Sequence, residues 1–223
     1  VLCVGSPTGL HFAFDEQNAR LAKAWRGRFL NAEKTWKGRA GGLEQPASGD
    51  SVDLSPGLPV LPSISMKSPW PGGGGLEVGA VIRGRTAHPD GSMTFRYEVG
   101  ELEVEERIQP IEVTIQEGVT TAPGTRLGLE RTFTVRAPVG TAVMARPVAA
   151  RGFESLGVGR WSLDGGPWPV IELDAQSARL ARIVDSVEGR DGPPAELRIP
   201  VHMLPEEPGS QTLVGTFSWR FAW

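Results

Sequence analysis

The segment Leu213-Val-Gly-Thr-Phe-Ser-Trp-Arg-Phe-Ala-Trp223 decides the fold class of this chain. Large apolar side chains recur at every second position, and smaller or polar side chains occupy most of the positions between them. Successive side chains of a strand point to opposite faces of a sheet, so this period of two predicts a half-buried β-strand. The apolar face comprises Leu213, Phe217, Trp219, Phe221 and Trp223, and the other face comprises Val214, Thr216, Ser218, Arg220 and Ala222.

The same alternation recurs along most of the chain, separated by turn signals that draw on 29 Gly and 19 Pro residues. Strands at such short spacing are typical of a sandwich or barrel rather than of βαβ units. We therefore expect an all-β antiparallel sandwich, either one large or one two-part structure, forming a single domain over residues 1–223 with a possible subdivision near 118–125. Strands are expected at 1–4, 10–14, 20–25, 76–85, 93–99, 102–108, 111–115, 127–135, 141–149, 160–163, 168–173, 179–184, 196–203 and 212–223.

The composition changes in residues 39–75, which are rich in Pro and Gly. This composition predicts one long irregular loop that wraps the sandwich. Apolar residues such as Leu61, Ile64 and Trp70 are expected to attach the loop to the core. Gly72 to Gly75 do not form a phosphate loop, because no Gly-Lys-Ser/Thr sequence and no strand-to-helix transition follows them.

The composition limits the function classes. A net charge of −3 with Arg scattered among Glu and Asp offers no basic stripe for nucleic acid. Cys3 is the only cysteine, so it cannot form an intrachain disulfide and is expected to be a small hydrophobe in a first strand. No apolar run is long enough to span a bilayer, and no signal peptide is visible. The chain begins without Met, which indicates a processed product or a fragment and leaves secretion and a removed lipid anchor open.

Motifs of catalysis and metal binding are not found. His11, His88 and His202 are isolated in the sequence, outside any Cys-x-x-Cys-His, His-Glu-x-x-His or His-x-His arrangement. No Gly-x-Ser-x-Gly nucleophile elbow is present. We therefore assign no catalytic residue, no metal ligand and no cofactor.

The acidic residues are interpreted as surface groups. Glu101, Glu103 and Glu105 share one strand face, which predicts a solvated face rather than a catalytic pair. The run continues into Glu106, on the same alternation as Val104. Asp50, Asp53 and Asp164 lack the spacing of a calcium loop.

The aromatic residues comprise seven Trp and eight Phe but only one Tyr, Tyr97. Most are expected to fill the core. Trp has a polar handle and is enriched at interfaces, so the Trp residues in predicted loops are the better candidates for a binding surface. These are Trp36, Trp70 and Trp168.

Three segments together resemble a β-domain of secreted bacterial proteins that also carry c-type cytochrome or sugar-dehydrogenase-like propeller modules. The segments are Val4-Gly-Ser-Pro-Thr-Gly-Leu-His-Phe-Ala-Phe-Asp15, Arg20-Leu-Ala-Lys-Ala-Trp-Arg-Gly-Arg-Phe-Leu30 and Thr35-Trp-Lys-Gly-Arg39. The stretches Thr94-Phe-Arg-Tyr97 and Leu102-Glu-Val-Glu-Glu-Arg107 and the aromatic final strand fit the same pattern. The resemblance implies an extracytoplasmic setting and a c-type cytochrome as neighbour, and it carries no catalytic residue to this chain.

These observations lead to one expected function and two alternatives. We expect a non-catalytic periplasmic or extracellular accessory subunit, peripheral to a membrane, that binds a protein of an electron-transfer complex. A photosynthetic reaction centre or a respiratory complex bearing a c-type cytochrome is the concrete form of this expectation. The first alternative is a carbohydrate-binding module whose loop Trp rings stack on sugars. The second is a sugar-active enzyme, for which the sequence offers only scattered titratable groups.

Overall fold

The computed structural model describes residues 1–31, 45–46, 51–54, 57–71, 75, 77–115, 124–164, 169–185 and 195–222. This part of the chain consists mostly of antiparallel strands, with the six-residue helix α2 (Ala175–Leu180). The predicted fold class, an all-β antiparallel sandwich, is confirmed.

A nine-stranded sheet, here called the large sheet, forms one layer. Its order begins at β13 (Phe153–Gly157) and ends at β8 (Ala80–Ala87), and β18 (Leu204–Pro205) pairs beside β19 off this path. The strands between them are, in spatial order, β14 (Arg160–Leu163), β15 (Val170–Leu173), β19 (Thr212–Ala222), β11 (Gly124–Pro138), β10 (Leu102–Ile115) and β9 (Met93–Val99).

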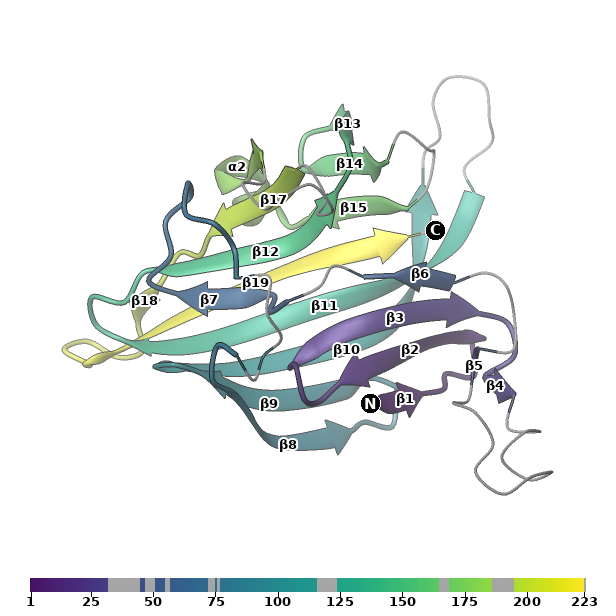
Figure 1. Cartoon of the computed structure of the whole chain (residues 1–223), viewed down its shortest axis with the longest axis horizontal. Coiled ribbons are helices and arrows are strands. Elements are labelled where there is room, and N and C mark those ends of the chain that lie inside the picture. Colours follow the sequence, from purple (N-terminus) through teal and green to yellow (C-terminus); the bar gives the residue numbers. More distant parts are fainter. Residues whose placement is uncertain are drawn as a thin grey trace.

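Two four-stranded sheets lie side by side in front of the large sheet (Figure 1). The first small sheet has the order β1 (Leu2–Val4), β2 (Leu10–Asp15), β3 (Arg20–Arg26) and β6 (Ser51–Asp53). The second small sheet has the order β16 (Arg182–Asp185), β17 (Ala195–Pro200), β12 (Val143–Ala150) and β7 (Val60–Pro62). A separate two-stranded pair joins β4 (Leu30–Asn31) to β5 (Gln45–Pro46).

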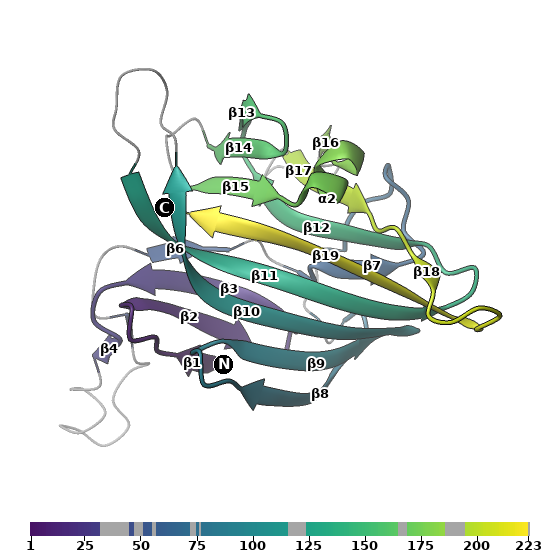
Figure 2. The same ribbon diagram turned by 180° about the vertical axis from the view of Figure 1, so that it is seen from behind.

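The final strand, β19, lies inside the large sheet, where it pairs with β11 on one side and β15 on the other (Figure 2). Phe217, Trp219 and Phe221 are buried, whereas Thr216 and Arg220 are exposed. The alternation that predicted this strand is therefore confirmed. Stacking between neighbouring strands adds to the burial, since the rings of Phe133 and Phe217 lie 5.1 Å apart and nearly parallel.

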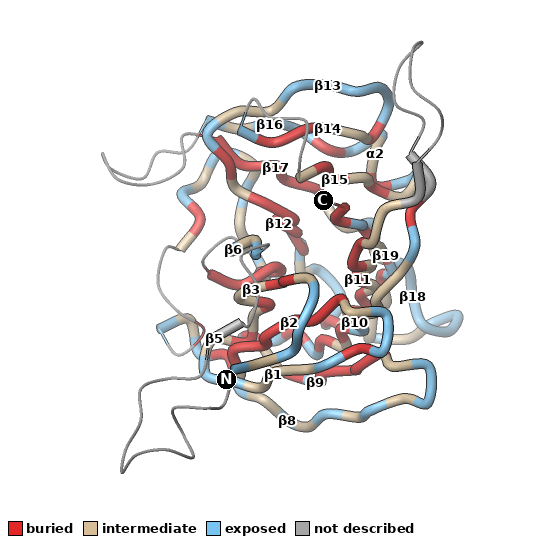
Figure 3. The backbone as a smooth tube through the Cα atoms, turned by 90° about the vertical axis from the view of Figure 1, so that its right-hand side faces the viewer, coloured by how far each residue is buried: buried red, intermediate tan, exposed pale blue. Residues whose placement is uncertain are grey.

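The core lies between the large sheet and the two small sheets (Figure 3). The large sheet curves from β8 at the bottom of this view to β13 at the top, and the small sheets face its concave side. Phe14 of β2 stacks on Phe95 of β9 with ring centroids 3.7 Å apart, which joins the first small sheet to the large one. One large cluster of buried side chains includes residues of all three sheets, so the three sheets share this core.

The structure corrects two of the predicted boundaries. The predicted loop at 39–75 contributes β6 and β7 to the two small sheets, and Leu61 and Trp70 from it are buried while Ile64 packs against the core. The strand predicted at 179–184 begins only at Arg182, because Asp174 caps a helix over the preceding residues. The sequence did not predict β6 and β7 because each has only three residues and lies in a stretch rich in Gly and Pro.

Candidate functional site

The two small sheets meet along a line that we call the seam. Leu54 follows β6, and its backbone N–H donates to the Ala22 carbonyl of β3 at 2.9 Å. Pro59 precedes β7, and its carbonyl accepts from the Arg146 N–H of β12 at 2.8 Å. The segment between these two points therefore connects the edge of one small sheet to the edge of the other. β12 carries a bulge between Ala145 and Val148, and such bulges are common where a strand reorients side chains toward a site.

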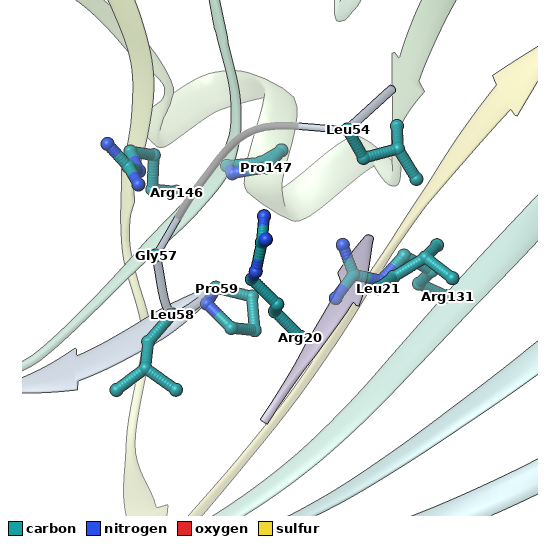
Figure 4. A pocket seen from close by; sticks show the side chains of 9 residues that line it. All are labelled: Arg20, Leu21, Leu54, Gly57, Leu58, Pro59, Arg131, Arg146 and Pro147. Atoms are coloured by element: carbon teal, nitrogen blue, oxygen red, sulfur yellow. The ribbon is translucent and has the colours of Figure 1, made fainter. Parts of the chain in front are cut away.

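Three arginines, one from each sheet, line a cavity of about 10 Å³ at the seam. Arg20 comes from β3, Arg131 from β11 and Arg146 from β12. The guanidinium groups of Arg20 and Arg131 point toward the same space, whereas that of Arg146 points away from it (Figure 4). The other lining residues are Leu21, Leu54, Gly57, Leu58, Pro59 and Pro147.

Arg131 belongs to a buried polar network beneath the seam. Its Nε donates to Oε1 of Glu106 at 2.7 Å, and the Tyr97 hydroxyl donates to Oε2 of the same carboxylate at 3.0 Å. The guanidinium also lies over the rings of Phe133 and Trp219, at 5.1 and 5.2 Å from their centroids. The side chain of Glu106 is inaccessible to solvent.

The pKa values in this network follow from its burial. Burial raises the pKa of Glu106 above its ordinary value of 4.5, although Arg131 and Tyr97 oppose the rise by stabilising the carboxylate. Burial also raises the pKa of Tyr97 well above 10, and the charge of Glu106 adds to this effect. The tyrosine therefore stays protonated and serves as a donor.

A second buried network holds Trp70. Glu196 accepts from Arg146 Nη1 at 2.6 Å and from Arg198 Nη2 at 2.5 Å. The indole lies near both guanidinium groups, with its centroid 4.9 Å from Arg146 and 5.5 Å from Arg198. The Trp70 N–H donates to the Leu58 carbonyl at 3.1 Å, so the polar end of the ring is also satisfied.

Among the described residues that line the seam cavity, the charged side chains are all arginines. Guanidinium groups stay protonated at accessible pH and only donate hydrogen bonds. The buried carboxylates, Glu106 and Glu196, are each held by arginine at 2.7 Å or less. This chemistry suits binding and rigid positioning.

The open edge is a second candidate site, formed by β13, the β13–β14 turn, α2 and β16. Among the described residues, β13 pairs only with β14 and β16 pairs only with β17. Four apolar side chains of this region are exposed: Leu156 at 45%, Val158 at 89%, Leu180 at 36% and Ile183 at 46%. They are four of nine large exposed hydrophobics in the described part of the chain, and the other five are scattered. An uncovered strand edge that carries apolar side chains is a template for binding another chain.

The outer face of the large sheet differs from the open edge. Its long side chains alternate in sign, as in Arg220–Glu130 at 2.8 Å and Arg96–Glu105 at 2.9 Å. A shallow hollow of about 310 Å³ lies on this face, bordered by Arg83, Arg96 and Arg136 and by glutamates. Because each of these arginines has a glutamate beside it, the face presents no strong charge of one sign.

The structure places only one of the three predicted surface tryptophans. Trp70 is 1% exposed, so its assignment to a binding surface is wrong. It is covered because two arginines of the second small sheet lie near its ring, a contact that sequence composition does not reveal. Trp36 and Trp168 lie outside the described residues.

The histidines and glutamates that the sequence analysis singled out differ in burial and in hydrogen bonding. His11 is buried, with Nδ1 accepting from the Ser6 N–H at 3.1 Å and Nε2 placed 2.8 Å from the Gly27 carbonyl. His202 is exposed. Glu101 and Glu103 are exposed as predicted, and Glu105 is half-buried. Glu106, by contrast, faces the core, and its place on the alternation of Val104 and Ile108 was the available signal.

Comparison of the chain with protein-family models, with curated proteins and with solved structures gives no match. Within the described ranges, no three His, Cys, Asp or Glu side chains gather closely enough to hold a metal ion. The helical segments that the structure describes lack the length and apolar character that crossing a bilayer requires.

Proposed function

We propose that this chain is a non-catalytic, extracytoplasmic interaction subunit that docks on a protein partner through the open edge. The partner we propose is a c-type-cytochrome-bearing electron-transfer complex, such as a photosynthetic reaction centre or a respiratory complex, because the sequence resembles β-domains that accompany c-type cytochromes. The observation that carries docking is the group of exposed apolar side chains on β13 and β16. A partner strand added to such an edge would form backbone hydrogen bonds and cover these side chains.

Other features support a binding role rather than a chemical one. The buried charged groups at the seam are engaged with one another, and His11 has a partner at each ring nitrogen. Polar groups that are paired in this way rigidify a scaffold. A rigid scaffold whose open edge exposes apolar side chains, as far as the described ranges show, is suited to an accessory subunit.

The test is photocrosslinking in native membranes of the source cells. A photoreactive amino acid replaces Leu156 or Ile183, and Val81, at 43% exposure on the opposite end of the large sheet, is the matched control. We expect crosslinks from positions 156 and 183, and not from 81, to a chain that stains for covalent haem. A crosslinked partner without haem would contradict the electron-transfer assignment and retain the docking surface. Purification of the chain alone, without crosslinks at either position, would contradict both.

A further inference from the structure

We propose that His11 is a pH-sensitive latch on the first small sheet. The neutral imidazole holds the turn at residues 5–9, here called the Ser6 turn, against the segment at residues 27–29. In mildly acidic solution the ring gains a second proton, and the Ser6 turn opens away from the ring of Phe29. This property is independent of the docking role proposed for the open edge.

The hydrogen bonds of His11 fix its protonation state. Nδ1 accepts from the Ser6 N–H at 3.1 Å, and Nε2 lies 2.8 Å from the Gly27 carbonyl oxygen. A carbonyl only accepts hydrogen bonds, so Nε2 carries the proton and Nδ1 is the bare acceptor. The residue is 4% exposed, and its ring joins the two segments from inside. The closed arrangement therefore fits one neutral tautomer of the imidazole.

A second proton conflicts with this arrangement. Protonation of Nδ1 would place an N–H of His11 and the N–H of Ser6 face to face, where a donor and an acceptor now meet at 3.1 Å. It would also leave a buried positive charge without its hydrogen bond, which is costly. The rings of Trp25 and Phe29 lie 5.7 and 5.2 Å from the imidazole, and their π faces attract a cation but do not replace the backbone acceptor. The proton therefore binds more tightly when the turn is open.

The Ser6 turn is the part of this region that can yield. Pro7 and Thr8 are exposed, and the ladder between β2 and β3 begins only at Leu10. Besides His11, the Gly27 N–H holds the turn by donating to the Gly9 carbonyl at 2.8 Å. The turn can therefore open while the strands remain paired, as local openings of native proteins do.

Phe29 reports the same contact from the other side. A Cβ added to Gly5 would lie 3.2 Å from the Phe29 ring, so the backbone of the turn packs directly against this ring. Phe29 is 39% exposed, and its carbonyl accepts from the indole N–H of Trp25 at 2.6 Å. Opening of the turn removes one wall of this aromatic group.

The charged groups on the elements around His11 are engaged elsewhere or carry positive charge. Asp15 lies 3.6 Å from Arg20, and Asp53 of β6 lies 3.0 Å from Lys23. Within the described ranges these carboxylates do not bond the imidazole, whose two nitrogens face backbone groups. The Ser6 turn contains no titratable side chain. The remaining charged groups are the guanidinium groups of Arg26 and Arg28 and the α-amino group of Val1.

The first test is NMR of the whole chain labelled with ¹⁵N. We expect the ring nitrogens of His11 to show the Nε2–H tautomer at about pH 7.5. We also expect the hydrogen-exchange protection factor of the Ser6 amide to fall by up to about tenfold for each pH unit below about pH 6.5, the ordinary titration point of a solvated histidine. Protection of β9 and β10 should not change over this range.

The second test uses two matched variants. His11→Gln has a side chain that does not titrate, so protection of the Ser6 amide should no longer depend on pH. His88→Gln is the control, because Nε2 of His88 lies 2.7 Å from the Thr94 hydroxyl, which can accept as well as donate. This control should keep the full pH response at Ser6.

Four results would overturn the proposal: an Nδ1–H tautomer of His11, Ser6 protection that is constant with pH, an equal loss of protection in β9 and β10, or a pH response that survives in His11→Gln. If His11→Gln does not fold, the tautomer and the protection profile of the wild type decide the question.

Discussion

Glu106 shows what a single inward-facing carboxylate costs and how it is tolerated. It is buried beside Tyr97 and Arg131, and all three side chains depend on one another for hydrogen bonds. Breaking a buried ion pair from one side leaves an uncompensated charge, whereas replacing the whole group with apolar side chains is often nearly neutral. The network therefore contributes specificity of packing more than net stability.

We expect Glu106→Gln to lower the free energy of unfolding by about 3–5 kcal/mol, because it leaves the Arg131 charge buried without a counter-ion. The triple variant Tyr97→Phe, Glu106→Leu, Arg131→Met is expected to recover most of this loss. Denaturant titration followed by Trp fluorescence measures both variants. Arg83→Gln, which removes an exposed ion pair with Glu98, is the control and should change stability little. A triple variant as unstable as the single one would contradict this account.

At the scale of elements, the N-cap residue Asp174 fixes the start of α2. Asp174 accepts hydrogen bonds from the backbone N–H groups of Gln176, Ser177 and Ser218, at 2.8 to 2.9 Å, and thereby ties the helix to β19. Burial alone would raise the pKa of Asp174, but hydrogen bonds from Ser177, Ser218 and Gln176 outweigh it and hold the pKa below its ordinary value of 3.8. The ionised form is therefore the stabilising one.

The cap predicts a pH dependence. Asp174→Ala is expected to lower the free energy of unfolding at neutral pH by about 1–2 kcal/mol. The pKa of Asp174 is lower in the folded state than in the unfolded state. The ionised carboxylate therefore makes its full contribution to the free energy of unfolding above the unfolded-state pKa, and this contribution is lost as the pH falls through the folded-state pKa. Asp174→Asn keeps an acceptor without titrating, so the difference between wild type and this variant should shrink below pH 3.8. Urea titrations across this range measure it, and a difference that is constant with pH would count against the assigned role.

β11 and β19 approach each other so closely at Gly128 that a side chain would not fit there. A Cβ at Gly128 would overlap the Phe221 carbonyl of β19, which is backbone and cannot turn aside. Gly128→Ala is therefore expected to destabilise the chain by about 2 kcal/mol or more. Gly84→Ala on β8 is the matched control, since a Cβ there meets nothing within 4 Å and alanine should be neutral or slightly stabilising. Thermal unfolding of the two variants decides the matter, and equal melting temperatures would refute the steric account.

On the scale of the whole molecule, Trp70 packs the segment after β7 against Arg146 and Arg198 of the second small sheet. Arg198 adds to this attachment, because its Nη1 donates to the Met66 carbonyl at 2.9 Å and to the Ser68 carbonyl at 2.5 Å. The predicted long loop is thus fixed along its later part by one aromatic ring and one guanidinium.

Trp70→Ala should lower the free energy of unfolding by about 3–5 kcal/mol and loosen this segment first. Hydrogen exchange followed by mass spectrometry is expected to show faster exchange at residues 60–71 than in wild type, with β9 and β10 unchanged under native conditions. A uniform increase over the chain would instead indicate global destabilisation.

The sequence predicted the sandwich because a half-buried strand carries apolar side chains at every second position, as at Phe217, Trp219 and Phe221. It did not predict the candidate sites, which depend on contacts between distant strands. Glu106 occupies an inward position in the alternation, but its partner Arg131 lies on another strand whose register the sequence does not determine. The cavity at the seam needs three sheets to meet, and no local pattern near Arg20 or Arg146 encodes that meeting.

The central place of β19 has a consequence for biosynthesis. The ribosome delivers this segment after β11 and β15, between which it must insert. Until it emerges, those two strands have unsatisfied backbone groups, so the large sheet cannot close before β19 has been synthesised. Closure of the large sheet therefore waits for a strand that is synthesised after both of its neighbours, and a stop codon just before Thr212 should give an aggregating product.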